Sequence, residues 1–441
     1  MKNNPVTVET TQTPEILTGK MPFSFIHAGD LHFDSFFEGI PEDIDKRIGK
    51  QIQDAPYRAF NNIIQLCLEK KVDFLLISGD IYDSENRSIL AQIRFYEGIR
   101  KLSEAGISVY IVYGNHDPTG SWTASLKPPS NCYIFPGNII THTIIKNGLP
   151  VADITGYSHN RMHVTENIAS SFPDAQGDLF HVGILHCSVD SPKEHENYAP
   201  CTKRDLLQKN FHYWALGHIH SQNTLNEAYP SIIYPGIPQG RNFRETGKRG
   251  CYYVTVDDKK RIQIEFIETD VFQFQEGDVS INGLSSLDEL IAQLIVDISN
   301  KQNEAGGRPL ILRYTITGRG YLHKDLSRSS ASVHLKQIIV DRFSDLGHFV
   351  ILNDLNIMTG LEQDREMVIQ KQPFLGELLY VAAHINEDDQ LKARILARIA
   401  ELYGSPKIST VLQEDSLPLI QTIVSSAEHL LIDKILQEVE E

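Results

Sequence analysis

Short apolar runs alternate with amphipathic stretches through the first part of the chain. Residues 23–29, 72–79 and 107–114 (FSFIHAG, VDFLLISG and ISVYIVYG) are apolar runs of strand length. Between them, residues 56–71 and 88–105 place apolar side chains at the spacing of one helix face. Alternation of strand and helix in this order predicts an α/β sheet with parallel strands.

After Asp117 the apolar runs become shorter and have few helical patterns between them. The predicted strands are NCYIF, NIITHTI, VADITGYS, LFHVGILHC, HYWALGH and IIYPG. Residues 251–269 predict a closing hairpin that turns around Asp257, Asp258 and Lys259. A β-rich sandwich whose first half is flanked by helices accounts for this pattern.

A change of pattern near residues 274–283 predicts a domain boundary. Beyond it we expect a helix over 284–301, a loop over 304–309 and a strand over 310–318. Helix and strand patterns continue to about Met358, which indicates a small α+β domain.

The last part of the chain, residues 373–441, has amphipathic helical patterns and carries 5 basic against 12 acidic residues. These helices could pack on the small domain or dock a partner. The predicted segments are a flexible N-terminal extension over 1–20, a main domain over 21–273, the small domain over 280–372 and the helical region over 373–441.

Composition limits the possible functions. The 41 basic and 57 acidic residues of the 441-residue chain give a formal charge of −16, so its overall field should repel nucleic acid and anionic membranes. Five cysteines without a CxxC pair argue against a disulfide framework and a thiolate zinc site. Without a signal-peptide pattern or an apolar window long enough for a membrane span, we expect a cytoplasmic protein.

Five polar clusters stand out because nearly all of them follow an apolar run. The clusters are Asp30-Leu31-His32, Gly79-Asp80, Gly114-Asn115-His116-Asp117, His186 and Gly217-His218-Ile219-His220. Ligand sites of α/β sheets gather beyond the carboxyl ends of strands, so these clusters can converge at one sheet edge.

Their side chains suit a divalent cation. Carboxylate, imidazole and amide groups without thiolate favour Mn, Fe or Zn. In an extended chain the side chains of Asp30 and His32 point to the same face, so both could bind one ion. The Asp80 carboxylate could bridge two ions, and such a pair activates water and neutralises charge on a phosphate. Gly79, Gly114 and Gly217 would let the backbone turn sharply beside the ions. Alternatively, these groups could only satisfy loop backbones inside the core.

The motifs D-x-H, G-D, G-N-H-D, H and G-H-x-H resemble those of the calcineurin-like metallophosphoesterases over residues 23–240. The resemblance implies an α/β four-layer sandwich, two β-sheets flanked by helices, with two divalent ions: Mn, with Fe and Zn as alternatives. The first ion would be held by Asp30, His32, Asp80 and His220. The second would be held by Asp80, Asn115, His186 and His218. His116 would protonate the leaving oxygen or stabilise the transition state, and Asp117 would orient it.

Further motifs resemble the bacterial DNA-repair exonucleases of the SbcD type, in particular the YhaO-like subgroup. They are HAGDLHFDS, GDIYD and YPGIPQG followed by Arg241, Phe243 and Glu245. Asp83 stands where archaeal and eukaryotic relatives commonly have His, so no role is transferred to it. The resemblance implies that residues 280–372 form a capping domain and that an SMC-like coiled-coil ATPase binds beyond it. The chain has no GxxxxGK[ST] motif of its own. The resemblance also allows a homodimer, because nucleases of this type are often dimeric.

A basic stretch follows the last predicted metal ligands. Residues 241–261 carry seven basic and three acidic side chains and could follow a phosphodiester backbone, or form an ordinary solvated hairpin. The candidate DNA contacts are Arg241, Arg244, Lys248 and Arg249. The aromatic side chains that could stack on bases, or simply pack, are Phe36, Phe37, Trp122 and Phe243.

Together these features predict a two-metal phosphodiesterase that cleaves DNA in repair or end processing, as an exonuclease with endonuclease activity as an additional mode. One alternative is a phosphodiesterase for small substrates, or a protein phosphatase, on the same fold. Another is a non-catalytic scaffold that binds DNA ends or an ATPase.

Overall fold

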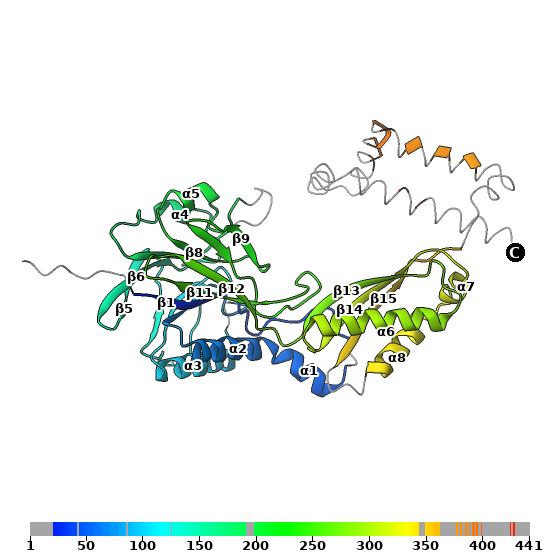
Figure 1. Ribbon diagram of the computed structural model, residues 1–441, viewed down its shortest axis with the longest axis horizontal. Helices are drawn as coiled ribbons and strands as arrows, with labels where there is room; N and C mark the ends of the chain where they lie inside the picture. Colours follow the sequence, from blue (N-terminus) through cyan, green and yellow to red (C-terminus); the bar gives the residue numbers. More distant parts are fainter. Residues whose placement is uncertain are drawn as a thin grey trace, which may run out of the picture. The chain divides into compact units, whose positions relative to one another are not determined.

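The computed structural model describes residues 21–41, 44–84, 87–124, 126–190, 198–343 and 349–361, with scattered positions between 376 and 427. The chain divides into two compact units, Met1–Phe274 and Gln275–Glu441 (Figure 1). The described part of the first unit contains two six-stranded sheets, and that of the second contains one three-stranded sheet.

The first sheet has the strand order β12-β11-β1-β2-β3-β4. Its strands are β1 (Phe23–Ala28), β2 (Phe74–Ser78), β3 (Ser108–Val112), β4 (Cys132–Ile134), β11 (Gly250–Val256) and β12 (Ile262–Glu268). Strands β1 to β4 run parallel, whereas the β11–β12 hairpin pairs antiparallel with β1. Both the parallel strands and the closing hairpin of the sequence prediction are confirmed.

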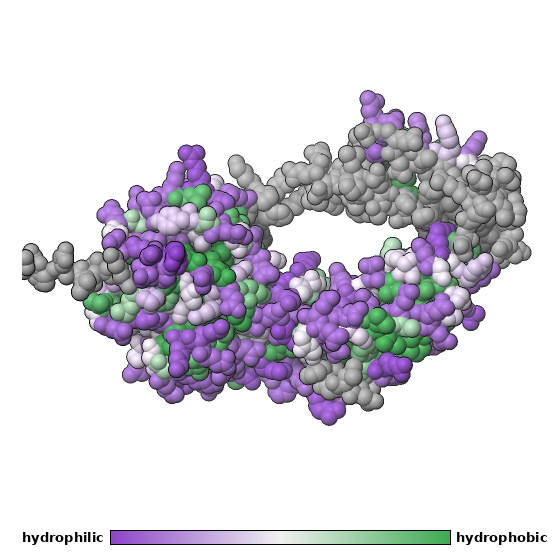
Figure 2. Space-filling model, viewed as in Figure 1, coloured by the Kyte–Doolittle hydropathy of each residue, from purple (hydrophilic) through white to green (hydrophobic). Residues whose placement is uncertain are grey.

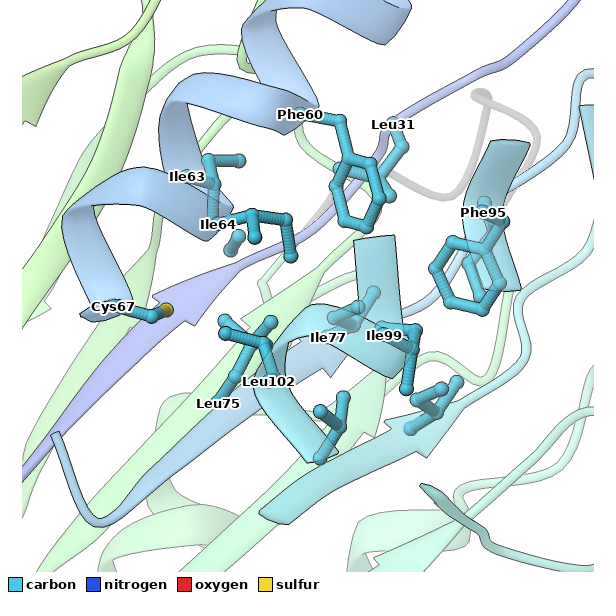
Figure 3. Close-up of a cluster of buried hydrophobic side chains, with 14 of the residues drawn as sticks. Leu31, Phe60, Ile63, Ile64, Cys67, Leu75, Ile77, Phe95, Ile99 and Leu102 are labelled. Carbon is cyan, nitrogen blue, oxygen red and sulfur yellow. The ribbon is translucent and has the colours of Figure 1, made fainter. Parts of the chain in front are cut away.

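Helices α2 (Ala55–Lys70) and α3 (Ile89–Glu104) cover one face of this sheet. Their apolar faces point toward β2, where the side chains of Leu75 and Ile77 are fully buried (Figure 3). The helix side chains in this layer include Phe60, Ile63, Ile64 and Cys67 of α2 and Phe95, Ile99 and Leu102 of α3. A preceding short helix, α1 (Lys46–Gln53), is capped by Asp45, whose carboxylate accepts a hydrogen bond from the Arg47 amide.

The second sheet packs on the opposite face of the first and has the order β5-β6-β7-β8-β10-β9. Its strands are β5 (Ile140–Lys146), β6 (Leu149–Tyr157), β7 (Phe180–His186), β8 (Tyr213–Gly217), β9 (Asn223–Asn226) and β10 (Ser231–Tyr234). Between the sheets, the Phe25 ring stacks on Phe74 at 4.9 Å and meets the edge of Tyr213 at 5.3 Å.

The short helices α4 (Ile168–Ser171) and α5 (Lys203–Leu207) lie over the outer face of the second sheet. There the buried Trp214 ring of β8 packs against Phe172 and Phe211. Figure 1 shows α2 and α3 on one side of the first unit and α4 and α5 on the other. The predicted α/β sandwich, two sheets flanked by helices, is therefore confirmed.

The second unit is an α+β fold. Strand β14 (Leu310–Thr317) lies between β13 (Gln273–Ser280) and the parallel strand β15 (Val350–Ile357). The helices of this sheet are α6 (Leu287–Glu304), α7 (His323–Leu326) and α8 (Ala331–Phe343). Leu290, Leu294 and Ile298, one turn apart on α6, are fully buried against the strands. Strand β13 crosses the expected boundary, because its first two residues belong to the first unit.

The predicted extension over 1–20 lies outside the described residues, as do most of the helices predicted within 373–441. Among the described helices, none combines the length and the apolar character that a membrane crossing requires. On the face seen in Figure 2, the described surface of the first unit is mostly hydrophilic and its apolar residues form small patches.

Candidate metal centre

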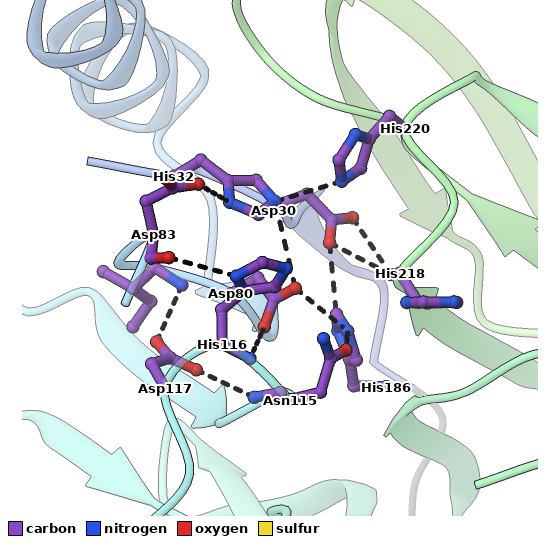
Figure 4. A network of polar contacts seen from close by, with 12 residues as sticks. Asp30, His32, Asp80, Asp83, Asn115, His116, Asp117, His186, His218 and His220 are labelled. Atoms are coloured by element: carbon purple, nitrogen blue, oxygen red, sulfur yellow. Dashed lines mark hydrogen bonds and ion pairs between the residues drawn. The ribbon is translucent and has the colours of Figure 1, made fainter. Parts of the chain in front are cut away.

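The five polar clusters meet beyond the carboxyl ends of β1, β2, β3, β7 and β8 (Figure 4). Asp80 Oδ2 lies 3.8 Å from His32 Nε2 and 3.3 Å from His186 Nε2. His186 Nδ1 lies 3.8 Å from Asp30 Oδ1. All four side chains are buried. The topology of the sheets therefore brings residues from distant parts of the sequence into one cluster, as expected.

The loops that carry these residues adopt an unusual backbone conformation. Asp30, His32 and Asp80 have φ angles of 52°, 45° and 48°, in the left-handed region that side chains with a Cβ rarely adopt. The Asp30 amide donates to the Gly79 carbonyl at 2.9 Å and the His32 amide to the Asp80 carbonyl at 3.0 Å. The expectation that an extended chain aligns Asp30 and His32 is therefore wrong, although both side chains do reach the same cluster. Hydrogen bonds between the loops hold this strained geometry.

The three glycines are needed for two different reasons. Gly79 has a φ of 101°, which fits the predicted sharp turn. Gly114 and Gly217 have no positive φ, but a Cβ atom at Gly114 would overlap Asp80 Oδ1 and one at Gly217 would overlap the Ser78 carbonyl oxygen. At these two positions the absence of a side chain serves close approach.

His32 and His220 form, together with Asp30, a group that could hold a metal ion. His32 Nδ1 lies 2.9 Å from Asp83 Oδ1, and His220 Nδ1 lies 2.8 Å from Glu245 Oε1. A carboxylate only accepts hydrogen bonds, so each Nδ1 carries a hydrogen and Nε2 is the ring nitrogen left for a metal ion. The two Nε2 atoms face each other at 3.0 Å. Two ring nitrogens that converge on one position, with the Asp30 carboxylate beside them, fit a divalent metal ion.

His186, Asp80 and Asn115 form an adjoining site. His186 Nδ1 lies 2.9 Å from the Ser78 carbonyl oxygen, to which it donates, so Nε2 is the ring nitrogen left to face this site. That Nε2 atom lies 3.0 Å from Asn115 Oδ1 and 3.3 Å from Asp80 Oδ2. Three potential ligand atoms thus lie close together, and Asp80 Oδ2 is also 3.8 Å from His32 Nε2 of the first group.

Burial and neighbouring charges shift the pKa values of these buried groups. Burial alone would lower the pKa of His186, but the Asp80 and Asp30 carboxylates outweigh it and raise that pKa to about 9. For His32, burial dominates and lowers the pKa to about 3, so this ring is neutral at ordinary pH. Burial raises the pKa of Asp30 to about 6, with the charges of His186 and His220 acting against it.

His218 lies beside this group in a different way from the other predicted ligands. Its main-chain N–H donates to both Asp30 carboxylate oxygens, at 3.0 and 3.2 Å. Its ring is 5.3 Å from the His186 ring, centroid to centroid, and its ring nitrogens are not part of the close clusters found among the described residues. The structure therefore brings six of the seven predicted ligand side chains into close contact and places the His218 ring next to them.

His116 and Asp117 differ from the predicted arrangement. The His116 ring donates from Nδ1 to the Asp83 carbonyl oxygen at 3.0 Å. The buried Asp117 carboxylate instead accepts from the main-chain amides of Gly114 and Ile81, at 2.9 and 2.8 Å. The prediction that Asp117 orients the His116 ring is therefore wrong. Asp117 joins two ligand-bearing loops, and the Asp83 main chain orients the ring.

Sequence reasoning missed the partners of the metal-site histidines. Asp83 and Glu245 accept the Nδ1 hydrogens of His32 and His220, an arrangement that fixes the tautomer and the orientation of a metal-binding imidazole. Both residues belong to motifs visible in the sequence. Their contacts, however, join loops far apart along the chain, so only the three-dimensional structure could assign the pairs.

The four predicted DNA-contact residues fall into two groups. Arg241 pairs with Asp83 and Glu245, and Arg249 donates to the main-chain oxygens of His220 and Thr246. These two guanidinium groups are therefore engaged inside the protein. Arg244 and Lys248 are exposed, although Lys248 Nζ lies 2.6 Å from Glu268 Oε1.

The four aromatic candidates for base stacking differ in their exposure to solvent. Phe36 is 90% exposed and Trp122 is 51% exposed. Phe37 packs on Phe272 with ring centroids 5.7 Å apart, and Phe243 packs on Phe274 at 5.1 Å. Phe36 and Trp122 are thus the exposed members of the set.

Two sheets flanked by helices, with histidines and aspartates gathered at the strand ends, define a metal-dependent phosphoesterase. Residues 23–222 match the calcineurin-like phosphoesterase family, and residues 274–360 match the middle domain of the metallophosphoesterase YhaO. The chain is 33% identical over 296 residues to the uncharacterized metallophosphoesterase YhaO of Bacillus subtilis, covering 67% of this chain and 72% of that protein. It therefore belongs to the calcineurin-like phosphoesterase family, whose members use a dimetal centre.

Similarity also extends to proteins named for DNA repair. The DNA double-strand break repair protein Mre11 of Thermoplasma acidophilum is 22% identical over 269 residues, 57% of this chain and 69% of that protein. Mre11 of Methanococcus maripaludis is 24% identical over 242 residues, 51% of this chain and 61% of that protein.

Proposed function

We propose that this chain is a two-metal phosphodiesterase that hydrolyses DNA, as an exonuclease with endonuclease cleavage as a second mode, in repair or end processing. The observation that carries the proposal is a pair of adjoining groups that share Asp30, one with His32 and His220 and one with Asp80 and His186. Asp80 Oδ2 also lies 3.8 Å from His32 Nε2, so it is placed between the two groups. The similarity to Mre11 proteins supports DNA as the substrate class. We further propose Mn²⁺ as the metal, since oxygen and imidazole groups without thiolate suit it.

The proposed ligands follow from the two clusters. One ion would be held by Asp30, His32 and His220. The other would be held by Asn115 and His186, with His218 beside it. Asp80 would bind both ions. When bound, two such ions make water a stronger nucleophile and neutralise the charge that develops on the phosphate.

His116 is proposed to manage the proton of the leaving group. The Asp83 carbonyl oxygen accepts its Nδ1 hydrogen, so Nε2 is the atom left to hold a proton and to give it to the departing sugar oxygen. The main-chain N–H of His116 donates to Asp80 Oδ1 at 3.0 Å. That bond fixes the loop beside the shared carboxylate.

Substrate contacts are proposed for exposed residues only. Arg244 and Lys248 could neutralise backbone phosphates, and Phe36 and Trp122 could stack on bases. Arg241 and Arg249 are no longer proposed for this role, because their guanidinium groups are bound within the protein.

The direct test uses end-labelled single- and double-stranded oligonucleotides with Mn²⁺, scored for polarity and product length. The wild-type chain should shorten them, and the Asp80→Ala variant from the same preparation should not. Bis-p-nitrophenyl phosphate serves as a control for general phosphodiesterase activity. Its hydrolysis without any oligonucleotide cleavage would refute the DNA substrate and support the alternative, a phosphodiesterase for small substrates.

We propose that residues 280–372 form a capping domain and that helices within 373–441 dock an SMC-like ATPase in the cytoplasm. The match of residues 274–360 to the YhaO middle domain supports the first assignment. Affinity purification from the native host, with a chain truncated after residue 372 as the comparison, tests the second. A large coiled-coil ATPase should accompany the full chain and be lost with the truncated chain.

A further inference from the structure

The guanidinium group of Arg241 lies between two carboxylates from distant parts of the chain. Its Nη1 is 3.1 Å from Asp83 Oδ1, and its Nη2 is 2.8 Å from Glu245 Oε1. The side chain of Arg241 is 14% exposed and that of Glu245 is 6% exposed. Arg241 therefore joins the loop after β2 to the segment after β10.

Each of these carboxylates also contacts a proposed metal ligand. Asp83 Oδ1 lies 2.9 Å from His32 Nδ1, and Glu245 Oε1 lies 2.8 Å from His220 Nδ1. A continuous chain of hydrogen bonds thus runs through His32, Asp83, Arg241, Glu245 and His220. Its two ends are the Nε2 atoms that face each other at 3.0 Å.

Arg241 has little freedom to do anything else. Its Nη1 also donates to Ser35 Oγ at 2.9 Å, and its main-chain N–H donates to Glu245 Oε2 at 2.8 Å. Nη2 lies 3.1 Å from His220 Nδ1, and since both nitrogens are donors here, Glu245 Oε1 accepts from both. The planar fork of the guanidinium is suited to such a double pairing, which a lysine ammonium does not reproduce.

We propose that Arg241 is a positioning residue of the metal centre, which acts through Asp83 and Glu245 to hold His32 and His220 at the spacing of one divalent cation. It compensates two neighbouring carboxylates that would otherwise repel each other. Charged carboxylates behind the rings keep the Nδ1 hydrogens in place and make each Nε2 a stronger ligand. This role differs from contact with DNA and does not depend on the substrate.

The charge state of Glu245 agrees with this arrangement. Burial alone would raise the pKa of its carboxyl, but hydrogen bonds from His220 and Arg241 outweigh burial and hold that pKa well below its usual range. The same balance, with His32 as the main donor, lowers the pKa of Asp83. Both groups are therefore charged acceptors at ordinary pH.

The first experiment measures Mn²⁺ binding by calorimetry in the Arg241→Gln variant, without nucleic acid. We expect binding about 10- to 100-fold weaker than in the wild-type chain, the range found when partners of metal ligands are removed. The matched control is Arg94→Gln, which removes a half-buried arginine from a carboxylate pair with Asp54 elsewhere in the same unit. The control should bind Mn²⁺ as the wild type does.

The second experiment asks whether Arg241 acts through the two carboxylates. In a chain with Asp83→Asn and Glu245→Gln, the further change Arg241→Gln should alter Mn²⁺ affinity by less than twofold. An additional tenfold loss in that background would overturn the proposal, because Arg241 would then act by another route. Should Arg241→Gln fail to fold, Arg241→Lys replaces it, with an expected intermediate loss because one ammonium cannot span both carboxylates.

The absorption spectrum of the Co²⁺-loaded chain supplies a readout of ligand geometry. Arg241→Gln should shift this spectrum, and Arg94→Gln should not. Unchanged Mn²⁺ affinity and an unchanged Co²⁺ spectrum in Arg241→Gln would overturn the proposal. These measurements involve only metal ions, so their outcome does not depend on whether DNA is the substrate.

Discussion

His32 Nε2 and His220 Nε2 face each other at 3.0 Å although each ring gives its Nδ1 hydrogen to a carboxylate. Two imidazole nitrogens held this close, with their other nitrogens bonded to carboxylates, are placed to bind one cation together. Only the folded chain brings these rings together, so a cation that binds both favours the folded state. Metal binding and folding should consequently be coupled.

Metal ions should raise the thermal stability of the first unit. Mn²⁺ at about 100 times its dissociation constant should stabilise the folded state by about 2.7 kcal/mol. For a unit of this size we expect Tm to rise by roughly 5–10 °C. Calorimetric scans with Mn²⁺ and with a chelator measure the shift. An equal shift in Asp80→Ala would show that the stabilising ion binds elsewhere.

Asp80→Ala should remove both ions together. Asp80 Oδ2 lies 3.8 Å from His32 Nε2 and 3.3 Å from His186 Nε2, so it is placed to serve both proposed ions. Mass spectrometric metal analysis of the purified variant should show metal at background level. Retention of one ion at full occupancy would exclude the shared carboxylate.

His116→Ala should keep its metal but lose activity. The ring contacts the Asp83 main chain, and the hydrogen bond to Asp80 comes from the main-chain N–H, which the variant retains. Loss of a positioned proton donor should slow cleavage of a labelled oligonucleotide, whose leaving group is a sugar oxygen, by about 10²- to 10⁴-fold. Metal content measured on the same sample decides the role, because a matching loss of metal would make His116 a ligand.

Gly114→Ala should weaken metal binding through a single methyl group. The new Cβ would overlap Asp80 Oδ1 and push the shared carboxylate out of place. We expect Mn²⁺ affinity at least about tenfold lower, as for other losses of ligand positioning. Gly120→Ala is the matched control, because its Cβ would lie 3.9 Å from the Asn160 carbonyl oxygen in ordinary contact. Equal affinities in the two variants would contradict the steric argument.

His27 should make the metal-free chain sensitive to acid. Its ring is fully buried between Tyr213 Oη and Ser78 Oγ, and burial lowers its pKa to about 3. Below pH 6.5 the unfolded chain binds a proton at this ring, but the folded chain does not until about pH 3. Acid therefore favours unfolding within that window, by about 2 kcal/mol at pH 5 relative to pH 7.5.

Urea titrations at the two pH values measure this contribution. Between pH 7.5 and pH 5, the free energy of unfolding should decrease in both chains. The decrease should be about 2 kcal/mol smaller in His27→Gln than in the wild-type chain. Substitution of the exposed His163 by Gln serves as the control and should behave as the wild type. A His27→Gln variant with the pH dependence of the wild type would show that this ring is not the acid-sensitive group.

Much of the fold could be predicted because its signals are local. Apolar runs such as 72–79 and the helical pattern of 88–105 reflect burial within single elements, and both elements form where expected. The positions of the metal-ligand motifs follow from the same signals, since each comes at the end of a strand. The pairing of the strands in two separate sheets depends on long-range contacts, which the resemblance to a family indicated and the pattern alone did not.

The sequence by itself determined which side chains can bind metal and where along each strand they stand. Only the tertiary structure decided how they act. It placed Asp30 and His32 in the left-handed region of backbone conformation and directed the Asp117 carboxylate to main-chain amides. It also paired Arg241 with two carboxylates of the protein, so this side chain is not available to a substrate. The physical reason is that a buried polar group must find partners of opposite character, and those partners come from whichever loops the folded chain brings within hydrogen-bond distance.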